Sequence, residues 1–274
     1  NVGVQGSVQA IGMCSSLQMS LPGPQPAIGM SNIASFSFTS TSSRKTELED
    51  ALYALNPAAT LTATSSRQAL DAIDYLAVAN PAQYAVQNGA VYPTTSFGTQ
   101  LKEVAQMIKS GVGVQMACVD IGGWDHHASI VSLLPPLLDE LAKGLLAFNT
   151  DLGMLMNKVT VVTMTEFGRR VKENASAGTD HGAGSAMLVM GGSVLGGKVY
   201  CEWPGLADAN LFNGDLDITV DYRTVFNELL HKRAQDGMVE TQFPGFTPGP
   251  WLGCFKKGNL DASGSIKPPK PVYT

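Results

Sequence analysis

The stretch GVGVQMACVDIGGWDHHA, residues 111–128, decides the fold. Its first part, residues 111–118, is a short apolar run that is partly β-branched and is soon followed by a Gly-Gly break. Such a run predicts a buried strand. Aspartate and histidine side chains follow directly, so the chain passes from a core strand into a set of candidate ligands.

The candidate ligands after this strand are Asp125 and His127. Extended backbone places alternate side chains on one face, so these two are expected to point together while Trp124 and His126 point away. A carboxylate and an imidazole at the carboxyl end of a strand are donors that zinc, manganese and magnesium sites use. The simpler interpretation is that Asp125 caps the next helix and the histidines lie on the surface. The stretch alone leaves both interpretations open.

Composition allows a full hydrophobic core and excludes one class of partner. With 274 residues and 44% apolar content, the chain can form one large domain or one domain with an appendage. The formal net charge is −5, and no cluster of lysines and arginines is interleaved with aromatic residues. The chain therefore lacks the basic patch that nucleic-acid-binding proteins present to phosphates. No run approaches the roughly 20 apolar residues of a membrane helix, so no membrane span is expected.

The cysteines and the first residues bear on compartment and processing. Cys14, Cys118, Cys201 and Cys254 show no C-x-x-C spacing, which argues against a zinc ribbon or a redox motif. Cys201 and Cys254 could form a disulfide if the protein is exported. The chain begins with Asn and lacks the basic start and apolar middle of a signal peptide, so we interpret it as a processed protein or a fragment.

Sequence patterns divide the chain into four parts. Residues 1–45 are rich in Gly, Ser and Pro and are expected to be irregular, with a candidate strand at Val8–Met13. Residues 46–110 carry three helical patterns and are expected to form a helical cover. Residues 111–255 form the predicted α/β core, and residues 256–274 an extended or disordered tail. The three predicted helices begin near Thr46, Ser66 and Phe97.

The core alternates strands and a helix. Residues 132–149 predict a helix, and residues 159–165 are a nearly continuous β-branched run that predicts a second parallel strand. A third strand is expected at Ala186–Met190, and a final helix at Tyr222–Arg233, begun by Asp221. This pattern favours an α/β fold, with a mostly parallel sheet and helices on both faces. The buried stripe of the helix is expected to be Leu134, Leu137, Leu138, Leu141 and Leu145.

Polar clusters lie near the ends of these strands. Ligands bind outside the carboxyl ends of strands in open α/β sheets, so the clusters are expected to share one functional edge. Each also has an ordinary explanation: Glu166 could pair with Arg170 on the surface, and Asp180 could be a turn residue. Together the clusters supply donors for divalent cations and an anionic substrate. Their members are Asp125, His127, Glu166, Arg169, Arg170, Asp180 and His181.

Three ordered motifs resemble a known family. GGWDHHA (122–128), TMTEFGRR (163–170) and GTDHGAGSAMLVMGG (178–192) are similar to motifs of the bacterial domain-of-unknown-function family 1501. The likeness extends from about Tyr92 to about Phe246. That family resembles the phosphatases and sulfatases of the alkaline phosphatase-like superfamily, so the resemblance implies an alkaline phosphatase-like fold.

The resemblance also implies roles for particular residues. Asp125 and His127 match the first paired metal ligands of the superfamily, and Glu166 resembles a replacement for the Asp of its strand-end Asp-His pair. His181 resembles the later lone histidine, with Asp180 beside it as a ligand or as a residue that orients one. Arg169 and Arg170 would bind the substrate anion.

Two departures from the superfamily pattern matter. His126 stands where the family usually has Thr, and it either adds a ligand or points away. Superfamily enzymes also carry an Asp ligand and a Ser, Thr or Cys nucleophile on a first strand and the helix after it. We find no such strand before Thr46, so the N-terminal part of the fold is expected to be missing and the nucleophile is not identified.

The expected function is that of a metal-dependent hydrolase of a phosphate or sulfate ester, or the core fragment of one. The cofactor would be a divalent metal, zinc in the first place, with manganese, magnesium or calcium as alternatives. The partner would be an anionic small-molecule or polymer ester, and by resemblance the location periplasmic or extracellular. The alternative is a non-catalytic exported binding or assembly protein. A Ser-His-Asp hydrolase is disfavoured because no G-x-S-x-G elbow occurs.

Overall fold

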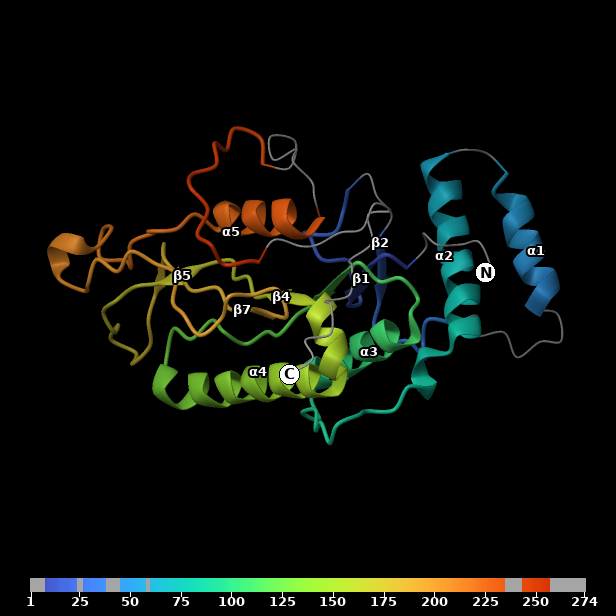
Figure 1. Cartoon of the computed structure of the whole chain (residues 1–274), viewed down its shortest axis with the longest axis horizontal. Helices are drawn as coiled ribbons and strands as arrows, with labels where there is room; N and C mark the ends of the chain where they lie inside the picture. Colours follow the sequence, from blue (N-terminus) through green and yellow to red (C-terminus); the bar gives the residue numbers. More distant parts are fainter. Residues whose placement is uncertain (1–7, 24–26, 38–44, 58–59, 235–242, 257–274) are drawn as a thin grey trace, which may run out of the picture. The chain divides into compact units, whose positions relative to one another are not determined.

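A computed structural model describes residues 8–23, 27–37, 45–57, 60–234 and 243–256. Figure 1 draws these residues in colour. The chain divides into two compact units. The first unit comprises Asn1–Gly123 and Pro136–Gly153, and the second comprises Trp124–Pro135 and Met154–Thr274. The predicted tail lies almost entirely outside the described residues.

The first unit contains a small parallel sheet. Strands β1 (Ala10–Met13), β2 (Ala27–Met30) and β3 (Met116–Val119) are arranged in the order β2-β1-β3. β1 and β2 have the same sequence, AIGM, and pair residue for residue. β1 lies within the candidate strand expected at Val8–Met13, whereas β2 was not expected from the sequence. β2 is only four residues long and contains a glycine, so the turn-forming composition around it concealed it.

Helices of the first unit match the predicted cover, with shifted ends. They are α1 (Lys45–Leu55), α2 (Leu61–Ala79), the short 3₁₀ segment η1 (Pro81–Gln83) and α3 (Ser96–Ser110). α2 begins five residues before the predicted Ser66, because the side chain of Thr60 accepts a hydrogen bond from the Ala63 N–H and caps the helix.

Helix α4 (Ile130–Leu152) is the longest element of the described residues. Its predicted stripe is only partly correct: Leu138 is 48% exposed, whereas Ala147 and Phe148 are buried. Gly144 is buried as well, and a Cβ there would lie 2.5 Å from the Phe97 ring of α3. The small residues near the end of α4 thus let α3 approach closely, which leucine periodicity alone does not reveal.

A buried ion pair joins α3 to α4 in the first unit. Lys109 Nζ lies 2.8 Å from Asp151 Oδ1, and the two side chains are 4% and 0% exposed. Asp151 also accepts hydrogen bonds from the Gln87 backbone N–H at 2.7 Å and from the Tyr92 hydroxyl at 2.9 Å. Every partner that a buried carboxylate needs is therefore present.

The second unit has two short antiparallel ladders. β4 (Thr160–Val162) pairs with β7 (Val189–Gly191), and β5 (Gly168–Arg169) pairs with β6 (His181–Gly182). The sequence predicted β4 as a second strand parallel to β3. That prediction is wrong, because β4 pairs antiparallel with β7 while β3 pairs with β1. The apolar residues on both faces of the run at residues 159–165 indicated a buried strand, but they did not indicate which strand would pair with it.

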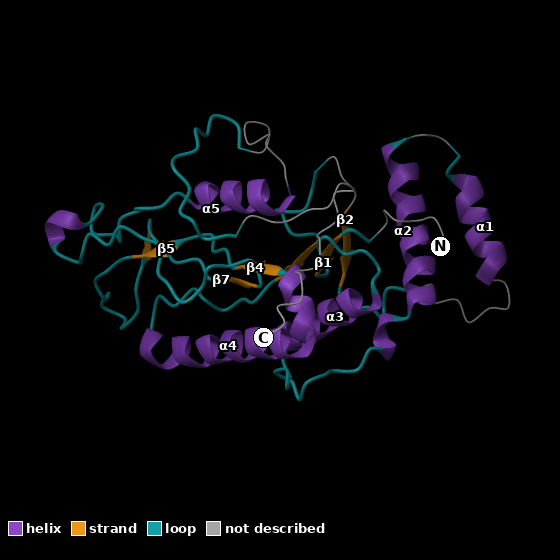
Figure 2. Cartoon of the chain, in the orientation of Figure 1, coloured by secondary structure: helices purple, strands orange, loops and turns teal. Residues whose placement is uncertain are grey.

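Helical segments of the second unit are short. They are the 3₁₀ segments η2 (Gly153–Lys158, whose first residue falls in the first unit) and η3 (Asp208–Asn210), helix α5 (Tyr222–Leu229) and the π-helical turn η4 (Leu230–Ala234). α5 begins where predicted, with the Asp221 side chain accepting from the Arg223 N–H. Loops carry most of this unit (Figure 2).

The core of the second unit forms where residues 253–255 pack along α5. Phe255 and Cys254 are 1% and 5% exposed. Glu228 of α5 is fully buried and accepts hydrogen bonds from the Gly253 and Phe255 backbone N–H groups and from Lys232 Nζ. Cys201 and Cys254 are both free thiols, so the disulfide considered from the sequence is absent.

Replacing Glu228 by glutamine is expected to lower the free energy of unfolding by about 2 kcal/mol at pH 7. Burial alone would raise the pKa of Glu228, but the Lys232 ammonium and the two backbone donors hold it below its ordinary value of 4.5. A lowered pKa in the folded state stabilises the protein fully above pH 4.5 and less as pH falls through the folded pKa. Urea unfolding of both proteins between pH 7 and pH 3 measures this.

The wild-type protein should lose its advantage over Glu228→Gln as the solution becomes acidic. Glu202→Gln is the matched control, because Glu202 is exposed and makes no hydrogen bond or ion pair to another described residue. Equal stability of Glu228→Gln and wild type at pH 7 would contradict the prediction.

The fold is a mixed α/β arrangement with one small parallel sheet and several helices. Among the described residues, two strand pairs are parallel and two are antiparallel, so the expectation of a mostly parallel sheet is too strong. Within the described residues, no helix combines the length and apolar content needed to cross a membrane.

Candidate metal centre

Asp125, His127 and His181 come together in the second unit. Their ligand atoms lie within 4.8 Å of one another. Asp125 Oδ1 is 3.0 Å from His127 Nε2 and 2.7 Å from His181 Nε2. Both imidazoles therefore direct the same ring nitrogen at one carboxylate oxygen, although the two histidines are 54 positions apart in the printed sequence.

Glycines allow the three motif segments to pack backbone against backbone. A Cβ on Gly178 would meet the carbonyl carbon of His127, and a Cβ on Gly182 would lie 2.5 Å from the carbonyl carbon of Arg169. Gly168 lies equally close to the backbone of Gly184. No larger residue fits at these positions without a backbone shift. The glycines of the GTDHG and EFGR motifs thus set how closely the ligand-bearing loops approach.

His127 is held from behind by Asp180. Its Nδ1 lies 3.2 Å from Asp180 Oδ1, on the side of the ring opposite Asp125. Asp180 Oδ1 also accepts a hydrogen bond from Asn174 Nδ2 at 3.0 Å. A carboxylate on the outer nitrogen of a histidine is the arrangement that orients histidine ligands in metal sites. Asp180 therefore occupies the orienting position rather than a place in the group of three.

His181 is held by stacking. Its ring lies on the Phe167 ring, with centroids 4.1 Å apart and planes 9° apart. The Arg169 guanidinium lies over the same phenyl ring, 4.8 Å from its centroid. The β5–β6 ladder places Arg169 directly opposite His181. One short hairpin-like pairing thus carries both the ligand and its aromatic support.

Arg169 acts as a brace in this structure. Its guanidinium donates to the backbone carbonyls of Thr179 and Trp124, and lies 3.3 Å from Asp125 Oδ1. It therefore ties together the two loops that carry Asp125 and His181. These contacts occupy much of the fork that an anionic substrate would use.

The electrostatics favour ionised carboxylates. The hydrogen bond with His181 lowers the pKa of Asp125, and the nearby charges of His127 and Arg169 act in the same direction. Hydrogen bonds from Asn174 and His127 lower the pKa of Asp180. Both groups are therefore anionic at neutral pH, the state required of a metal ligand or of an orienting carboxylate.

Two of the predicted site residues are not brought into the cluster. Glu166 is exposed and makes no hydrogen bond or ion pair to another described residue. Arg170 Nε lies 3.2 Å from Asp215 Oδ1, so the suggested Glu166–Arg170 pair is not formed either. The alternation of side chains along an extended segment explains this, since Phe167 and Arg169 face the cluster and leave their neighbours facing away.

Sequence reasoning missed Phe167 and Asn174, and left His126 undecided. His126 is only 5% exposed and is not in the cluster, so it points away from the ligands. Phe167 lies inside a quoted motif, where alternation with Arg169 was an available signal. Asn174 lies in the turn-rich stretch ENASAG, where Asn bonding to nearby backbone is common.

The donor set fits a divalent cation. Tetrahedral zinc with bonds of about 2.1 Å holds its ligand atoms about 3.4 Å apart, so the separations of 2.7 and 3.0 Å from Asp125 Oδ1 would need to widen by about 0.7 and 0.4 Å. Two imidazoles and one carboxylate are ligands of catalytic zinc sites, which leave a position open. The side chains of Asp125, His127 and His181 are 59%, 48% and 49% exposed, so the centre is accessible from solvent.

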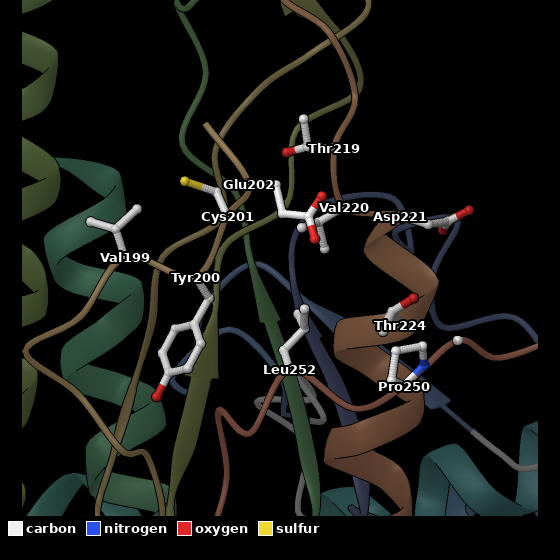
Figure 3. Close-up of a pocket in the computed structure, with 11 residues that line it drawn as sticks. Val199, Tyr200, Cys201, Glu202, Thr219, Val220, Asp221, Thr224, Pro250 and Leu252 are labelled. Carbon is white, nitrogen blue, oxygen red and sulfur yellow. The ribbon is translucent and has the colours of Figure 1, made fainter. Parts of the chain in front are cut away.

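A separate pocket of about 460 Å³ lies elsewhere in the second unit (Figure 3). Its lining includes Tyr200, Glu202, Asp221 and Leu252 and no residue of the candidate metal centre. Asp221 is already bound by Arg223, whose Nη2 lies 2.6 Å from Asp221 Oδ2. The pocket is only partly enclosed, and the described residues of its lining include no group of three ligands close enough to share a metal ion.

Comparison with known proteins gives a family without an activity. The family described as "Protein of unknown function (DUF1501)" matches residues 21–239. No curated protein and no solved structure matches the chain.

Proposed function

Because the chain belongs to the DUF1501 family, whose description carries no activity, we propose a function from the geometry of the site: a metal-dependent hydrolase of phosphate or sulfate esters. The single observation that carries this proposal is the convergence of Asp125, His127 and His181, with Asp180 behind His127. The resemblance of the three motifs to the alkaline phosphatase-like superfamily supports the choice of substrate class.

The chain's residues divide into ligands and supports. Asp125 and the two histidine Nε2 atoms would hold the ion, zinc in the first place. A bound divalent cation supplies positive charge that polarises a phosphoryl or sulfuryl oxygen. Asp180 fixes the outer nitrogen of His127, and Arg169 holds the ligand loops together.

Anion recognition would come mainly from the centre itself. The guanidinium groups of Arg169 and Arg170 are engaged with backbone carbonyls and with Asp125 and Asp215. We therefore assign Arg169 to loop positioning. Only those guanidinium N–H groups of Arg169 that meet no acceptor in the protein would contact the substrate. Export to the periplasm or outside the cell is part of the same proposal and rests on the family resemblance.

The alternative is a non-catalytic binding or assembly protein that keeps these loops for packing. The exposure of the donor set argues against a purely structural metal site, since structural zinc sites are closed by four protein ligands. The superfamily's many chemistries mean that the fold alone does not choose between the two functions.

Calorimetric titration of the metal-free protein tests the proposal. We expect a single zinc ion to bind per chain, with weaker binding of manganese, magnesium and calcium. The zinc-loaded protein is then assayed with p-nitrophenyl phosphate and p-nitrophenyl sulfate. We expect it to hydrolyse one of the two esters, and a chelator should abolish this hydrolysis. Failure to take up any of the four metals in excess would sink the proposal. Metal uptake without hydrolysis of either ester would favour the alternative.

A further inference from the structure

Asn174 contacts both the backbone of His127 and the carboxylate that orients the His127 ring. Its side-chain Nδ2 lies 2.9 Å from the His127 carbonyl oxygen and 3.0 Å from Asp180 Oδ1. Its Oδ1 accepts hydrogen bonds from the backbone N–H groups of Ser176 at 2.9 Å and Gly178 at 3.1 Å. One amide group therefore makes four hydrogen bonds.

The orientation of this amide is fixed by its partners. Two backbone N–H groups face one end, and a carbonyl and a carboxylate face the other, so exchanging Oδ1 and Nδ2 would oppose donor to donor and acceptor to acceptor. Asn is the residue type that satisfies both ends. Aspartate would satisfy only the Ser176 and Gly178 donors.

The backbone around Asn174 closes the same loop. The Asn174 N–H donates to the Gly178 carbonyl at 2.9 Å, and the Ala177 N–H donates to the Asn174 carbonyl at 3.2 Å. The loop then docks on the chain after His127, because the Ser129 N–H donates to the Ser176 carbonyl at 3.1 Å. Backbone hydrogen bonds thus hold this loop, and the Asn174 side chain adds a hydrogen bond to Asp180.

Asp180 needs this contact because solvent surrounds it. Its side chain is 56% exposed and that of His127 is 48% exposed, so packing holds neither of them firmly. The Asn174 amide restrains the Asp180 carboxylate, and the restrained carboxylate accepts the Nδ1 proton of His127. The opposite nitrogen, Nε2, is then directed at Asp125.

We propose that Asn174 is a positioning residue that acts through Asp180 to fix the His127 ring for metal binding. The proposal rests on the metal centre proposed above and adds a residue outside the ligand set. Outer partners of ligating histidines typically contribute 10- to 100-fold in metal affinity, so a change at Asn174 alone should be measurable.

The test compares Asn174→Asp with wild type. The aspartate keeps an acceptor for Ser176 and Gly178, so the loop should stay folded, but it presents negative charge to Asp180 and removes the donor. We expect zinc affinity to fall about 10- to 100-fold, with little change in melting temperature. Asn32→Asp is the matched control, because Asn32 Oδ1 likewise accepts from a backbone N–H, that of Ser35, and Asn32 belongs to the first unit. It should leave zinc affinity unchanged.

A second readout needs no metal. Nitrogen–proton spectra of the histidine rings in the metal-free protein should show a hydrogen-bonded Nδ1 proton on His127 in wild type and its loss in Asn174→Asp. If wild type takes up no zinc, the proposed function fails, while the ring spectrum still decides whether Asn174 positions His127. Unchanged zinc affinity together with an unchanged ring signal in Asn174→Asp would overturn the inference.

A reciprocal exchange strengthens the test. In the double variant Asn174→Asp with Asp180→Asn, an amide and a carboxylate again face each other, and the oxygen of the new amide can still accept from His127. Zinc affinity of the double variant should exceed the value expected from adding the two single losses. Simple additivity would contradict a direct link between positions 174 and 180.

Discussion

A variant with both His127 and His181 replaced by alanine is expected to take up no zinc and to remain folded. The two imidazoles supply two of the three donor atoms, and Asp125 alone leaves one exposed carboxylate. Both histidine side chains are about half exposed, so their loss should change the free energy of unfolding by about 1 kcal/mol or less. Calorimetric zinc titration and urea unfolding of the same preparation measure the two effects.

His126→Ala is the control for this experiment and should show the opposite behaviour. His126 is 5% exposed and lies outside the cluster, so removing it costs stability through lost packing while zinc uptake persists. If the double variant still bound zinc as wild type does, the cluster would not be the metal site. A modest loss of stability without loss of function would favour the non-catalytic alternative.

Replacing Asp151 by alanine is expected to destabilise the first unit by about 3–5 kcal/mol, since it leaves the Lys109 ammonium buried without its counter-charge. The Tyr92 hydroxyl and the Gln87 N–H also lose their acceptor. Burial is the largest cause of the raised pKa of Tyr92 and remains in the variant, so Tyr92 cannot compensate by ionising near neutral pH. Urea or thermal unfolding at pH 7 measures the loss.

Asp139→Ala is the matched control on the same helix. Asp139 also pairs with a lysine, Lys143, at 2.6 Å, but both side chains are largely exposed. An exposed pair four residues apart on a helix contributes about 0.3–0.5 kcal/mol. Similar losses in the two variants would show that burial of the Lys109–Asp151 pair does not carry the effect.

The helices were the most predictable part of the fold. α3 and α5 begin within one residue of the predicted positions, because Thr95 and Asp221 provide caps that sequence reveals. The strands were less predictable. A buried strand was expected at residues 111–118, but β3 begins at Met116 and its residues are exposed or half-buried. The partner of β4 was not expected, because pairing depends on distant segments and a run of three to five apolar residues carries no information about direction.

The candidate site was predictable where the candidate ligand lies within one of the three motifs. Asp125, His127 and His181 were expected as metal ligands, and their side chains meet in one cluster. Glu166 was expected beside them and lies apart, since residue type does not reveal which face of a short extended segment turns inward. Asn174 could not be found, because its role depends on a loop closure that only the folded backbone shows.

The identical AIGM tetrapeptides of β1 and β2 bear on how the chain selects its sheet order during folding. Either copy presents the same side chains to β3, so the strands themselves cannot decide which copy becomes central. One contact outside the strands distinguishes the two copies, because Gln18 Nε2, in the segment after β1, donates to Asp120 Oδ2, directly after β3, at 3.0 Å. Contacts of the connections, rather than the strand sequences, therefore distinguish the observed order from the order with the two copies exchanged.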